Sequence, residues 1–470
     1  MLTFELDKSR SRALTCQVYQ QLRSQILSGA LPKGERLPST RSLSSELQIS
    51  RNTVQTAYSL LESEGFLVSK SGSGVFVSRL PILLEPKAFV RSSEQTASLS
   101  PEKITPGQIN FDSGLPAVSL FPRSNWNRTV SRAFLDAPDS ALGYDDPQGR
   151  PELRTAIASW LEHSRGLRCE AGQILVTSGA KQGLTLIAKC LLSSASTVIL
   201  EDPGNANIRR IVSYHTSRVL PIPVDREGLL TNRLPAEAHR ALIVTTPSRQ
   251  FPMGATLPLH RRIELLEYAR KTDSFLVEDD YDSEFRYDSA PVRSLFELDG
   301  SRVIYVGTFS KYLFPSLRLG FLVLPRSLVP VFLEWKRLSD HHSNSVYQLA
   351  LALWMESGAF ERHIRRMKKV YAKKRAELIA LLRDRFVTAA EVVGDASGLH
   401  LVASFPGVRF TPEFISRIRE RGVYLVPVSQ HSILDGHEDQ LILGYGALEQ
   451  EQMRLGLDIL YECIAGYTDS

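Results

Sequence analysis

Few cysteines and no long apolar run characterise this chain, and each shortage excludes a class of protein. The 470 residues include only four cysteines, which are Cys16, Cys169, Cys190 and Cys463. They are scattered and form no Cys-x-x-Cys pair, which argues against a disulfide framework or a zinc site and favours the reducing cytoplasm. No stretch approaches the roughly 18 consecutive apolar residues of a membrane span, and the polar start MLTFELDKSR contains no secretory apolar region. We therefore expect a cytoplasmic protein that does not enter a membrane.

The overall composition is ordinary for a globular protein, but the charge is unevenly distributed. Hydrophobic residues make up 43% of the chain and charged residues 23%, and a chain of this length predicts several domains. Residues 1–80 contain ten Lys/Arg against six Asp/Glu, which accounts for +4 of the total net charge of +5. A basic N-terminal segment on a near-neutral body favours a module that binds phosphate groups.

The pattern of residues 1–79 predicts an α+β winged helix-turn-helix domain. Residues 14–28 have the apolar spacing of an amphipathic helix, and a connector with two prolines, LPKGERLPS, follows. TRSLSSELQ predicts a short helix, and Ser50 is a good N-cap for the next helix, which we expect to end at Gly65. FLVSK and VFVS flank a Gly/Ser turn and predict a hairpin. This order of elements is typical of domains that insert the second helix of the turn into the DNA major groove.

The segment LPKGERLPSTRSLSSELQISRNTVQTAYSLLESEGFLVSKSGSGVFV resembles the GntR-type winged helix over nearly its whole length. The resemblance implies contacts with double-stranded DNA from three parts of the domain. The residues are Arg41 on the helix before the turn, Ser50, Arg51, Asn52 and Gln55 on the recognition helix, and Lys70, Ser71 and Gly72 at the wing tip. The chemistry agrees, because arginine can read guanine bidentately and asparagine or glutamine can read adenine. The alternative is that several of these are simply solvated helix residues.

Residues 80–109 are a mixture of Pro, Ser and Glu without periodicity and predict a linker. After residue 109, the sequence pattern predicts alternating strands and helices. ILVTSGA, STVILEDPG, ALIVTTP, FLVEDDYD and VIYVGTFS are apolar runs that each end in a polar or glycine-bearing turn. They predict an α/β domain over residues 110–345, with a largely parallel sheet that presents ligand groups at the carboxyl ends of its strands. Long helices and the strands GLHLVASF and LILGYGAL predict a smaller α+β domain over residues 346–470.

The residues at these strand ends match what pyridoxal 5'-phosphate requires of a protein. The cofactor needs a lysine for a Schiff base, a carboxylate at its ring nitrogen, a donor to its phenolate oxygen and a phosphate cradle. Lys311, Asp279 and Tyr281 supply the first three, and the small-residue turn at 177–182 opens a helix suited to phosphate. Residues 278–280 (EDD) could instead form a divalent-cation site or a solvated acidic edge, but without histidine or further spaced oxygens no metal is expected.

In this order, the pieces resemble the fold-type-I aminotransferases over roughly residues 110–465. The resemblance implies that Lys311 carries the cofactor, Asp279 pairs with its ring nitrogen and Tyr281 donates on the phenolate side. It also implies a phosphate cradle, formed by Gly179, Ala180, Lys181, Thr308 and Arg318. The segment YDDPQGRPELRTAIASWL resembles the one that leads into the large domain and the subunit boundary.

A GntR-like winged helix fused to an aminotransferase-like domain is the architecture of the MocR/GabR regulators. The segments EDDYDSEF, GTFSK and TPSRQFPMG of this chain resemble the motifs of that family. The resemblance implies a homodimeric transcription regulator of amine, amino-acid or vitamin B6 metabolism that binds repeated half-sites. Its cofactor would act in sensing, with an amine or pyridoxal phosphate itself as the effector.

Several positions depart from that family. Asn205 follows EDPG where a tyrosine is frequent, Arg249 stands where histidine is common, and Met253 replaces a common threonine or serine. Residues 433–440 (ILDGHEDQ) are acidic and lack the arginine that binds the ligand carboxylate in the GABA-responsive member and in true aminotransferases. We therefore expect an effector other than GABA and little transamination.

Some alternatives stay open. Arg209 or Arg210 could replace the missing arginine, which would permit an active aminotransferase with an appended winged helix. The large domain could also have lost its cofactor and serve only for dimerisation. The run RHIRRMKKVYAKKR at 362–375 holds eight Lys/Arg in 14 residues, which is either the solvated face of an inter-domain helix or an additional contact to the DNA backbone.

Overall fold

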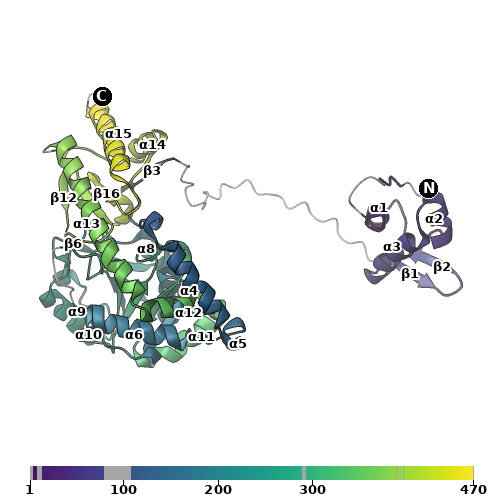
Figure 1. The fold of residues 1–470 in the computed structure, drawn as a ribbon, viewed down its shortest axis with the longest axis horizontal. Coiled ribbons are helices and arrows are strands. Elements are labelled where there is room, and N and C mark those ends of the chain that lie inside the picture. Colours follow the sequence, from purple (N-terminus) through teal and green to yellow (C-terminus); the bar gives the residue numbers. More distant parts are fainter. Residues whose placement is uncertain are drawn as a thin grey trace. The chain divides into compact units, whose positions relative to one another are not determined.

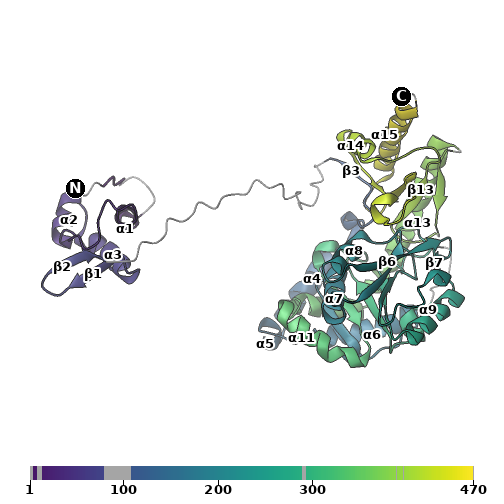
Figure 2. The same ribbon diagram turned by 180° about the vertical axis from the view of Figure 1, so that it is seen from behind.

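A computed structural model describes residues 4–7, 13–78, 107–287, 293–387, 389–394 and 396–468. The chain divides into two compact units, Met1–Pro101 and Glu102–Ser470, which Figures 1 and 2 show from opposite sides. Most of the expected linker, residues 80–106, lies outside the described residues. The two units are therefore considered separately.

The N-terminal unit is a winged helix-turn-helix, as the sequence predicts. Its elements follow the expected order, namely α1 (Leu14–Leu27), α2 (Thr40–Leu47), α3 (Arg51–Ser63), β1 (Leu67–Lys70) and β2 (Gly74–Val77). The Ser39 and Ser50 hydroxyls cap α2 and α3 by accepting hydrogen bonds from backbone N–H groups of the first turn. The inner faces of the helices and the hairpin enclose one small core that includes Leu22, Val54 and Leu61.

The second unit is built on a large mixed sheet. Its strands are β4 (Ile174–Thr177), β5 (Thr197–Asp202), β6 (Arg218–Asp225), β7 (Gly228–Leu229), β8 (Leu242–Thr245), β9 (Phe275–Asp280), β10 (Val303–Thr308) and β11 (Gly320–Val323). The spatial order is β4-β11-β10-β9-β8-β5-β6-β7. The central strands from β10 to β6 are parallel, whereas β11 runs antiparallel to both of its neighbours. The α/β prediction is thus confirmed, and β6, β7 and β11 are strands that the expected set did not include.

Both faces of this sheet are buried, because successive side chains of each strand enter different cores. Helices α7 (Ala180–Leu191), α8 (Ala206–Ser213) and α11 (Val329–Asp340) cover one face. Helices α6 (Pro151–Arg165), α9 (Leu259–Lys271), α10 (Leu295–Leu298) and α12 (Ser345–Glu356) lie on the other, where α4 (Arg123–Leu135) packs on α12 and α5 (Asp139–Leu142) follows it. Burial on both faces explains why the strands appear as continuous apolar runs rather than as alternating ones.

A smaller sheet lies beyond the long helix α13 (Ala359–Phe386). Its strands pair in the order β12 (Glu391–Val393), β13 (His400–Ser404), β16 (Gln440–Gly444) and β15 (Val426–Pro427), all antiparallel. Helices α14 (Pro412–Glu420) and α15 (Gln450–Thr468) complete this region, which we call the small region, residues 389–468. Figure 1 shows α13 running between the large sheet and this region.

The first described segment of the second unit threads back to the small region. Its strand β3 (Ile109–Asn110) pairs in parallel with β14 (Val423–Tyr424). The chain then passes so close to Gly444 that a Cβ there would lie 2.2 Å from the backbone oxygen of Asp112. This path leads residues 112–114 to the carboxyl ends of the large sheet. No helix among the described residues is long and apolar enough to cross a membrane.

Candidate functional site

The strand ends that carry the predicted site residues meet at one edge of the large sheet. β9 and β10 are parallel neighbours, with Asp279 opposite Val306. Gly320, at the start of antiparallel β11, lies opposite Thr308 at the end of β10 and opposite Thr177 at the end of β4. The sheet register therefore gathers segments that are more than a hundred residues apart in the chain.

Asp279 is a buried carboxyl group with an unused oxygen. Its side chain is 5% exposed, and among the described residues Oδ1 has no hydrogen-bond partner. Burial, together with the neighbouring Asp280 and Glu201 carboxylates, raises the pKa of Asp279 to about 7, and Lys311 opposes that shift. A buried acceptor without a donor is costly, so this oxygen is suited to a cationic N–H group of a bound molecule.

Lys311 lies three residues beyond β10 and reaches the same edge. Its Nζ donates to the backbone oxygen of Gly114 at 2.6 Å, and a Cβ at Gly114 would lie 2.8 Å from that nitrogen. Burial lowers the pKa of Lys311, while Asp112, Asp282 and Asp279 act in the opposite direction. A lowered pKa favours the neutral amine, which is the nucleophilic form.

The turn between β4 and α7 forms an open cradle. Gly179 caps α7 with a φ of 91°, a conformation that favours glycine, and Ala180 is the first residue of the helix. The Arg318 Nη2 atom donates to the backbone oxygen of Ser178 at 2.6 Å, and a Cβ at Gly179 would lie 3.2 Å from the same Arg318 atom. Lys181 is exposed on the first turn of α7. A helix N-terminus beside an arginine is a ready site for a phosphate group.

A second cation supports this turn from below, and the sequence reasoning missed it. Lys336 of α11 is fully buried, and its Nζ donates to Asp340 at 2.8 Å, to Gln182 at 3.0 Å and to Ser343 at 3.1 Å. Gln182 in turn accepts from the backbone N–H of Ser178 at 2.7 Å. The available signal was the position of Lys336 four residues after the buried Phe332, on the inner face of α11.

Tyr281 and Arg249 form a hydrogen-bonded pair beside Asp279. The Arg249 Nη1 atom donates to the Tyr281 hydroxyl at 3.0 Å and forms an ion pair of 3.2 Å with Asp282. Arg249, which departs from the histidine common at this position, is therefore an internal structural cation rather than an exposed ligand group.

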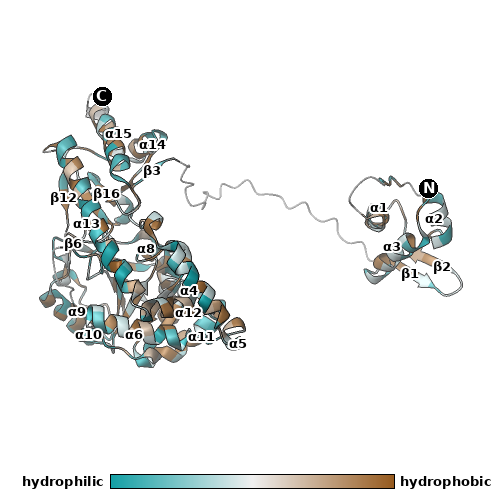
Figure 3. Cartoon of the chain, viewed as in Figure 1, coloured by the Kyte–Doolittle hydropathy of each residue, from teal (hydrophilic) through white to brown (hydrophobic). Residues whose placement is uncertain are grey.

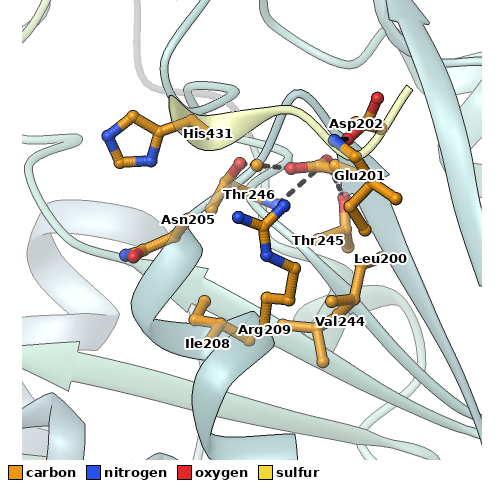
Figure 4. A pocket seen from close by; sticks show the side chains of 12 residues that line it. Leu200, Glu201, Asp202, Asn205, Ile208, Arg209, Val244, Thr245, Thr246 and His431 are labelled. Atoms are coloured by element: carbon orange, nitrogen blue, oxygen red, sulfur yellow. Dashed lines mark hydrogen bonds between the residues drawn. The ribbon is translucent and has the colours of Figure 1, made fainter. Parts of the chain in front are cut away.

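A pocket opens next to this edge, between β5, β8, α8 and the segment around His431. Figure 4 shows the Glu201 carboxylate directed at Thr245 and Thr246, and it accepts from the Thr246 hydroxyl at 2.6 Å and from the Thr246 backbone N–H at 3.1 Å. Asn205, which stands where a tyrosine is frequent in the family that the sequence resembles, caps α8 by accepting from the Asn207 N–H at 3.0 Å. The space beside Asn205 remains part of the pocket.

Of the two candidate replacements for the missing arginine, one is bound to backbone oxygens and the other is exposed. Arg209 lines the pocket but donates to the backbone oxygens of Ser432 at 2.9 Å and Gln430 at 3.3 Å, whereas Arg210 is exposed on α8. Residues 433–440 lead into β16, which begins at Gln440, and the backbone N–H groups of Ile433 and Leu434 donate to Asp202.

All of the predicted DNA-contacting residues lie on the surface of the winged helix. Ser50 uses its hydroxyl to accept from the Thr53 N–H at 3.1 Å, so its main local role is to cap α3. The Arg51 Nε atom lies 3.4 Å from the Thr40 hydroxyl, which holds the arginine at the start of α3. Gly72, with a φ of 73°, sits in the tight turn between β1 and β2.

The basic run at 362–375 lies in α13 and divides by burial. Its exposed cations are Arg362, Arg365, Arg366, Lys369 and Lys373, and α13 shows a strongly hydrophilic surface in Figure 3. Lys374 instead points inward and donates to the backbone oxygen of Leu448 at 2.6 Å. A DNA contact by the exposed face stays a prediction. Among the described residues, no group of His, Cys, Asp or Glu side chains is arranged to hold a metal ion.

The raised pKa of Asp279 predicts a pH-dependent stability of the cofactor-free protein. Its folded-state pKa of about 7 exceeds the ordinary 3.8, so the folded state binds the proton more tightly and stability falls as pH rises from about 4 to about 7. At pH 8 we expect Asp279→Asn to be more stable than the unmodified protein by roughly 1–3 kcal/mol in urea unfolding, with the gap closing toward pH 4.

Glu278, whose pKa burial also raises to about 7, leaves a residual slope in that variant. The exposed Asp136 offers the control, since Asp136→Asn should leave the pH profile unchanged. A variant less stable than the unmodified protein at every pH would contradict this account of Asp279.

Comparison with known protein families agrees with the two-unit structure. Residues 14–77 match the family described as bacterial regulatory proteins, gntR family. Residues 106–458 match aminotransferase class I and II. The second match covers well over half of the chain.

Curated relatives share the same arrangement end to end. The chain is 37% identical to the uncharacterized HTH-type transcriptional regulator YhdI of Bacillus subtilis, over 97% of this chain and 96% of that protein. It is 33% identical to the probable rhizopine catabolism regulatory protein MocR of Rhizobium meliloti, over 97% and 94%. It is also 30% identical to the pyridoxine biosynthesis regulator PdxR of Corynebacterium glutamicum, over 96% of each chain.

Solved structures resemble the second unit. LysN, the α-aminoadipate aminotransferase of Thermus thermophilus, complexed with a phosphopyridoxyl-leucine adduct, aligns with a TM-score of 0.71 and 27% identity, over 77% of this chain and 93% of that one. The kynurenine aminotransferase of Pyrococcus horikoshii, in complex with PMP, aligns with a TM-score of 0.71 and 26% identity, over 77% and 91%.

The residues at the strand ends fit pyridoxal 5'-phosphate, the cofactor of this family. The unpartnered Oδ1 of Asp279 suits a protonated ring nitrogen, and the glycine at position 179 lets the Arg318 guanidinium approach the N-terminus of α7, where a phosphate group can bind. The chain therefore belongs to the MocR/GabR-type transcription regulators, which join a gntR-family winged helix to an aminotransferase-like domain that depends on pyridoxal 5'-phosphate.

Proposed function

We propose that this regulator acts as a cytoplasmic homodimer that holds pyridoxal phosphate on Lys311 and uses it to sense an amine or the supply of the cofactor itself. The observation that carries the proposal is the buried, unpartnered Asp279 carboxyl oxygen beside Lys311. Burying such a group has no structural benefit by itself, and a cationic ring nitrogen would offset its cost.

Each residue of the site has a separate task in this proposal. Asp279 holds a proton on the ring nitrogen, and Lys311 attaches the cofactor from the end of β10. Thr308, Arg318 and the N-terminus of α7 bind the phosphate. When bound, the cofactor supplies an electrophilic carbon that amines can reach. Sensing then requires only that an amine bind one conformation of the protein more tightly than another.

The winged helix supplies the DNA contact. Exposed Arg51, Asn52 and Gln55 begin α3, the second helix of the turn, and this is the part of such a domain that reaches base edges. In a homodimer, two copies would read repeated half-sites. Lys70, Ser71 and Gly72 would contact the flanking backbone from the wing.

An exposed apolar surface supports the homodimer. Near the ends of α4, α5 and α11, the exposed side chains are Phe134, Leu135, Leu142, Tyr144 and Leu338, with exposures from 56% to 89%. The Tyr144 ring lies edge-on to the His341 ring, with 5.1 Å between ring centroids, and remains 89% exposed. Both views place α4, α5 and α11 close together. Soluble monomers rarely leave so many large apolar groups together in water, and a second copy is the occupant proposed here.

The effector should not depend on a carboxylate fork. The acidic stretch 433–440 offers no arginine, and the Arg209 guanidinium is bound to backbone oxygens. An amine other than GABA, or pyridoxal phosphate itself, fits this arrangement better. The names of two relatives refer to rhizopine catabolism and pyridoxine biosynthesis, which supports target genes in amine or vitamin B6 metabolism.

A working aminotransferase with an appended winged helix is the alternative. The chain is 29% identical to the 2-aminoadipate transaminase of Thermus thermophilus, over 77% of this chain and 91% of that one, which favours it. Positioning of the substrate contributes several kcal/mol to catalysis. The missing arginine would remove part of that contribution, and this argues against an active aminotransferase. Multiple turnovers of any α-amino acid at enzyme-like rates would decide for the alternative.

Lys311 should be the residue that binds the cofactor covalently. Protein reconstituted with pyridoxal phosphate should absorb visible light, and borohydride should fix the cofactor to the peptide that contains Lys311. In Lys311→Ala both signals should disappear, because Lys311 is the amine that reaches this edge beside Asp279. Lys271, an exposed lysine at the end of α9, is the control, and Lys271→Ala should leave the covalent adduct in place. Failure of the unmodified protein to give an adduct would refute the cofactor role.

Arg51 should contribute to sequence recognition. If it reads a base, Arg51→Ala should weaken operator binding by about 1–3 kcal/mol and relax the preference at one position. Binding assays with operator and random DNA at fixed salt measure both effects, and Arg168→Ala, in an exposed loop of the second unit, is the control. Equal losses on the two DNAs would show that Arg51 contacts phosphate instead.

The exposed apolar surface should be the dimer interface. Leu135→Glu places a charge among the exposed side chains of α4 and should convert the protein to a monomer in sedimentation experiments, because burying an unpaired charge is costly. Leu455→Glu on α15, a leucine that is also exposed, is the matched control. A dimer that withstands the change at Leu135 but not at Leu455 would locate the interface elsewhere.

A further inference from the structure

Arg249 is a buried cation whose three nitrogens are all engaged. The residue lies in the loop after β8 and is 3% exposed. Its Nε atom donates to the Ser397 hydroxyl at 3.0 Å, and its Nη2 atom donates to the backbone oxygen of His400 at 2.7 Å. Its Nη1 atom faces the Tyr281 hydroxyl at 3.0 Å and the Asp282 carboxylate at 3.2 Å. The side chain is therefore held in one orientation.

These partners belong to two different parts of the second unit. Tyr281 and Asp282 directly follow β9, the strand that carries Asp279. Ser397 and His400 belong to the small region, at the start of β13. One guanidinium group thus connects the edge of the large sheet to the small region.

The surrounding chain is shaped to receive this guanidinium. Gly398 has a φ of 73°, and a Cβ there would lie 2.3 Å from Arg249 Cζ and 2.5 Å from the Asp282 carboxylate. The hydroxyls of Tyr287 and Tyr445 both donate to the Gly398 backbone oxygen, each at 2.5 Å. No side chain at position 398 could coexist with this arginine.

The groups around Arg249 accept hydrogen bonds from it, and two of them are His400 and Asp282. His400 Nε2 donates to the backbone oxygen of Pro252 at 3.0 Å, which leaves Nδ1 to accept from Arg249 at 3.1 Å. Burial and the neighbouring arginine lower the pKa of His400 well below its ordinary value, so the ring is neutral. Asp282 is the carboxylate that balances the guanidinium.

Tyr281 is left with one hydrogen to donate. A guanidinium can only donate, so the Tyr281 oxygen accepts from Arg249 and its own O–H must point elsewhere. Burial raises the pKa of Tyr281 well above its ordinary value, although Arg249 opposes the shift, so the hydroxyl keeps its proton. Among the described residues no acceptor receives that hydrogen. Donation from a hydroxyl that itself accepts from a cation is strengthened.

We propose that Arg249 is a positioning residue that orients the Tyr281 hydroxyl as a donor to the phenolate oxygen of bound pyridoxal phosphate and couples this donor to the small region through Ser397 and His400. The inference rests on the proposed function, since it requires the cofactor on Lys311. A displacement of the small region would weaken the Tyr281 hydrogen bond, and a change at the cofactor would pull on the small region. This is a physical route by which an effector could alter the conformation of the regulator.

The test is the pH midpoint of visible absorbance in the full-length protein loaded with pyridoxal phosphate. A weaker donor leaves more negative charge on the phenolate oxygen, so the proton shared with the Lys311 nitrogen is held more tightly and the midpoint rises. Arg249→Lys keeps the charge opposite Asp282 but loses the fork. We expect it to raise the midpoint by about one pH unit, as for loss of one charge-assisted hydrogen bond.

A double-mutant cycle with Tyr281→Phe distinguishes positioning from general destabilisation. In the Tyr281→Phe protein, Arg249→Lys should produce no further shift, because the hydroxyl through which it acts is gone. Ser397→Ala, which removes only the contact to the small region, should shift the midpoint in the same direction by a smaller amount. Equal shifts in both backgrounds, or no shift from Arg249→Lys, would overturn the proposal.

Arg262→Lys is the matched control. Arg262 is also buried, but it donates to the backbone oxygens of Leu257, Pro247 and Arg293 and not to Tyr281, so the midpoint should stay unchanged. If Arg249→Lys does not fold, Ser397→Ala decides, because it removes one hydrogen bond to Arg249 and leaves both buried charges in place; an unmoved midpoint in that variant would overturn the proposal. Protein that binds no cofactor at all refutes the proposed function, whereas bound cofactor with an unmoved midpoint refutes only the role of Arg249.

Discussion

The burial of acidic groups at the carboxyl ends of parallel strands is the constraint on which this site depends. Glu201, Asp279, Asp280 and Asp282 are each less than a tenth exposed, and charges in such surroundings persist only with partners. Glu201 accepts hydrogen bonds from threonine hydroxyls. Asp280 is paired with Arg165 and accepts from the Tyr305 hydroxyl, and Asp282 is paired with Arg249. Asp279 and Asp282 each keep one oxygen without a hydrogen-bond partner among the described residues, but Asp282 is already ion-paired with Arg249 through its other oxygen. Asp279 has no such ion pair in the described part of the chain, so it is the carboxyl group of the four that is suited to a cationic ligand.

This distribution of partners separates support from function. The ion pairs of Asp280 and Asp282 are internal and anchor the segment that follows β9, so that Asp279 is presented at a fixed place. Lys336 fixes the turn between β4 and α7 in a similar way. Its Nζ donates to Gln182 and Asp340, and Gln182 accepts from the backbone N–H of Ser178. A rigid shell of this kind is what a cofactor site requires for its geometry. It is also the physical basis for our proposal that a conservative change such as Arg249→Lys would act on the cofactor without touching it.

The departures from the aminotransferase pattern are concentrated on the amino-acid side of the site. Asn205 caps a helix, Arg209 is bound to carbonyl oxygens and residues 433–440 carry negative charge. On the cofactor side, in contrast, Asp279, Lys311 and the turn at Gly179 lie at one edge of the large sheet. We infer that a site of this kind is better suited to recognition than to turnover, which agrees with the attached DNA-binding unit.

The sequence by itself determined the two-unit organisation, the winged helix and the α/β class, since these follow from local patterns such as the Ser50 cap, the hairpin turn and the apolar strands. It also singled out Lys311 and Asp279, because the residue types at several strand ends, taken together and in their order along the chain, match what the cofactor requires. The tertiary structure decided which partners they have. Arg249 meets Ser397 across 148 residues and Lys311 meets Gly114 across 197, and the strand β3 that brings Gly114 there pairs with β14 in the small region. Such contacts depend on how the sheets pack, and no local periodicity encodes the position of a group so distant in the chain.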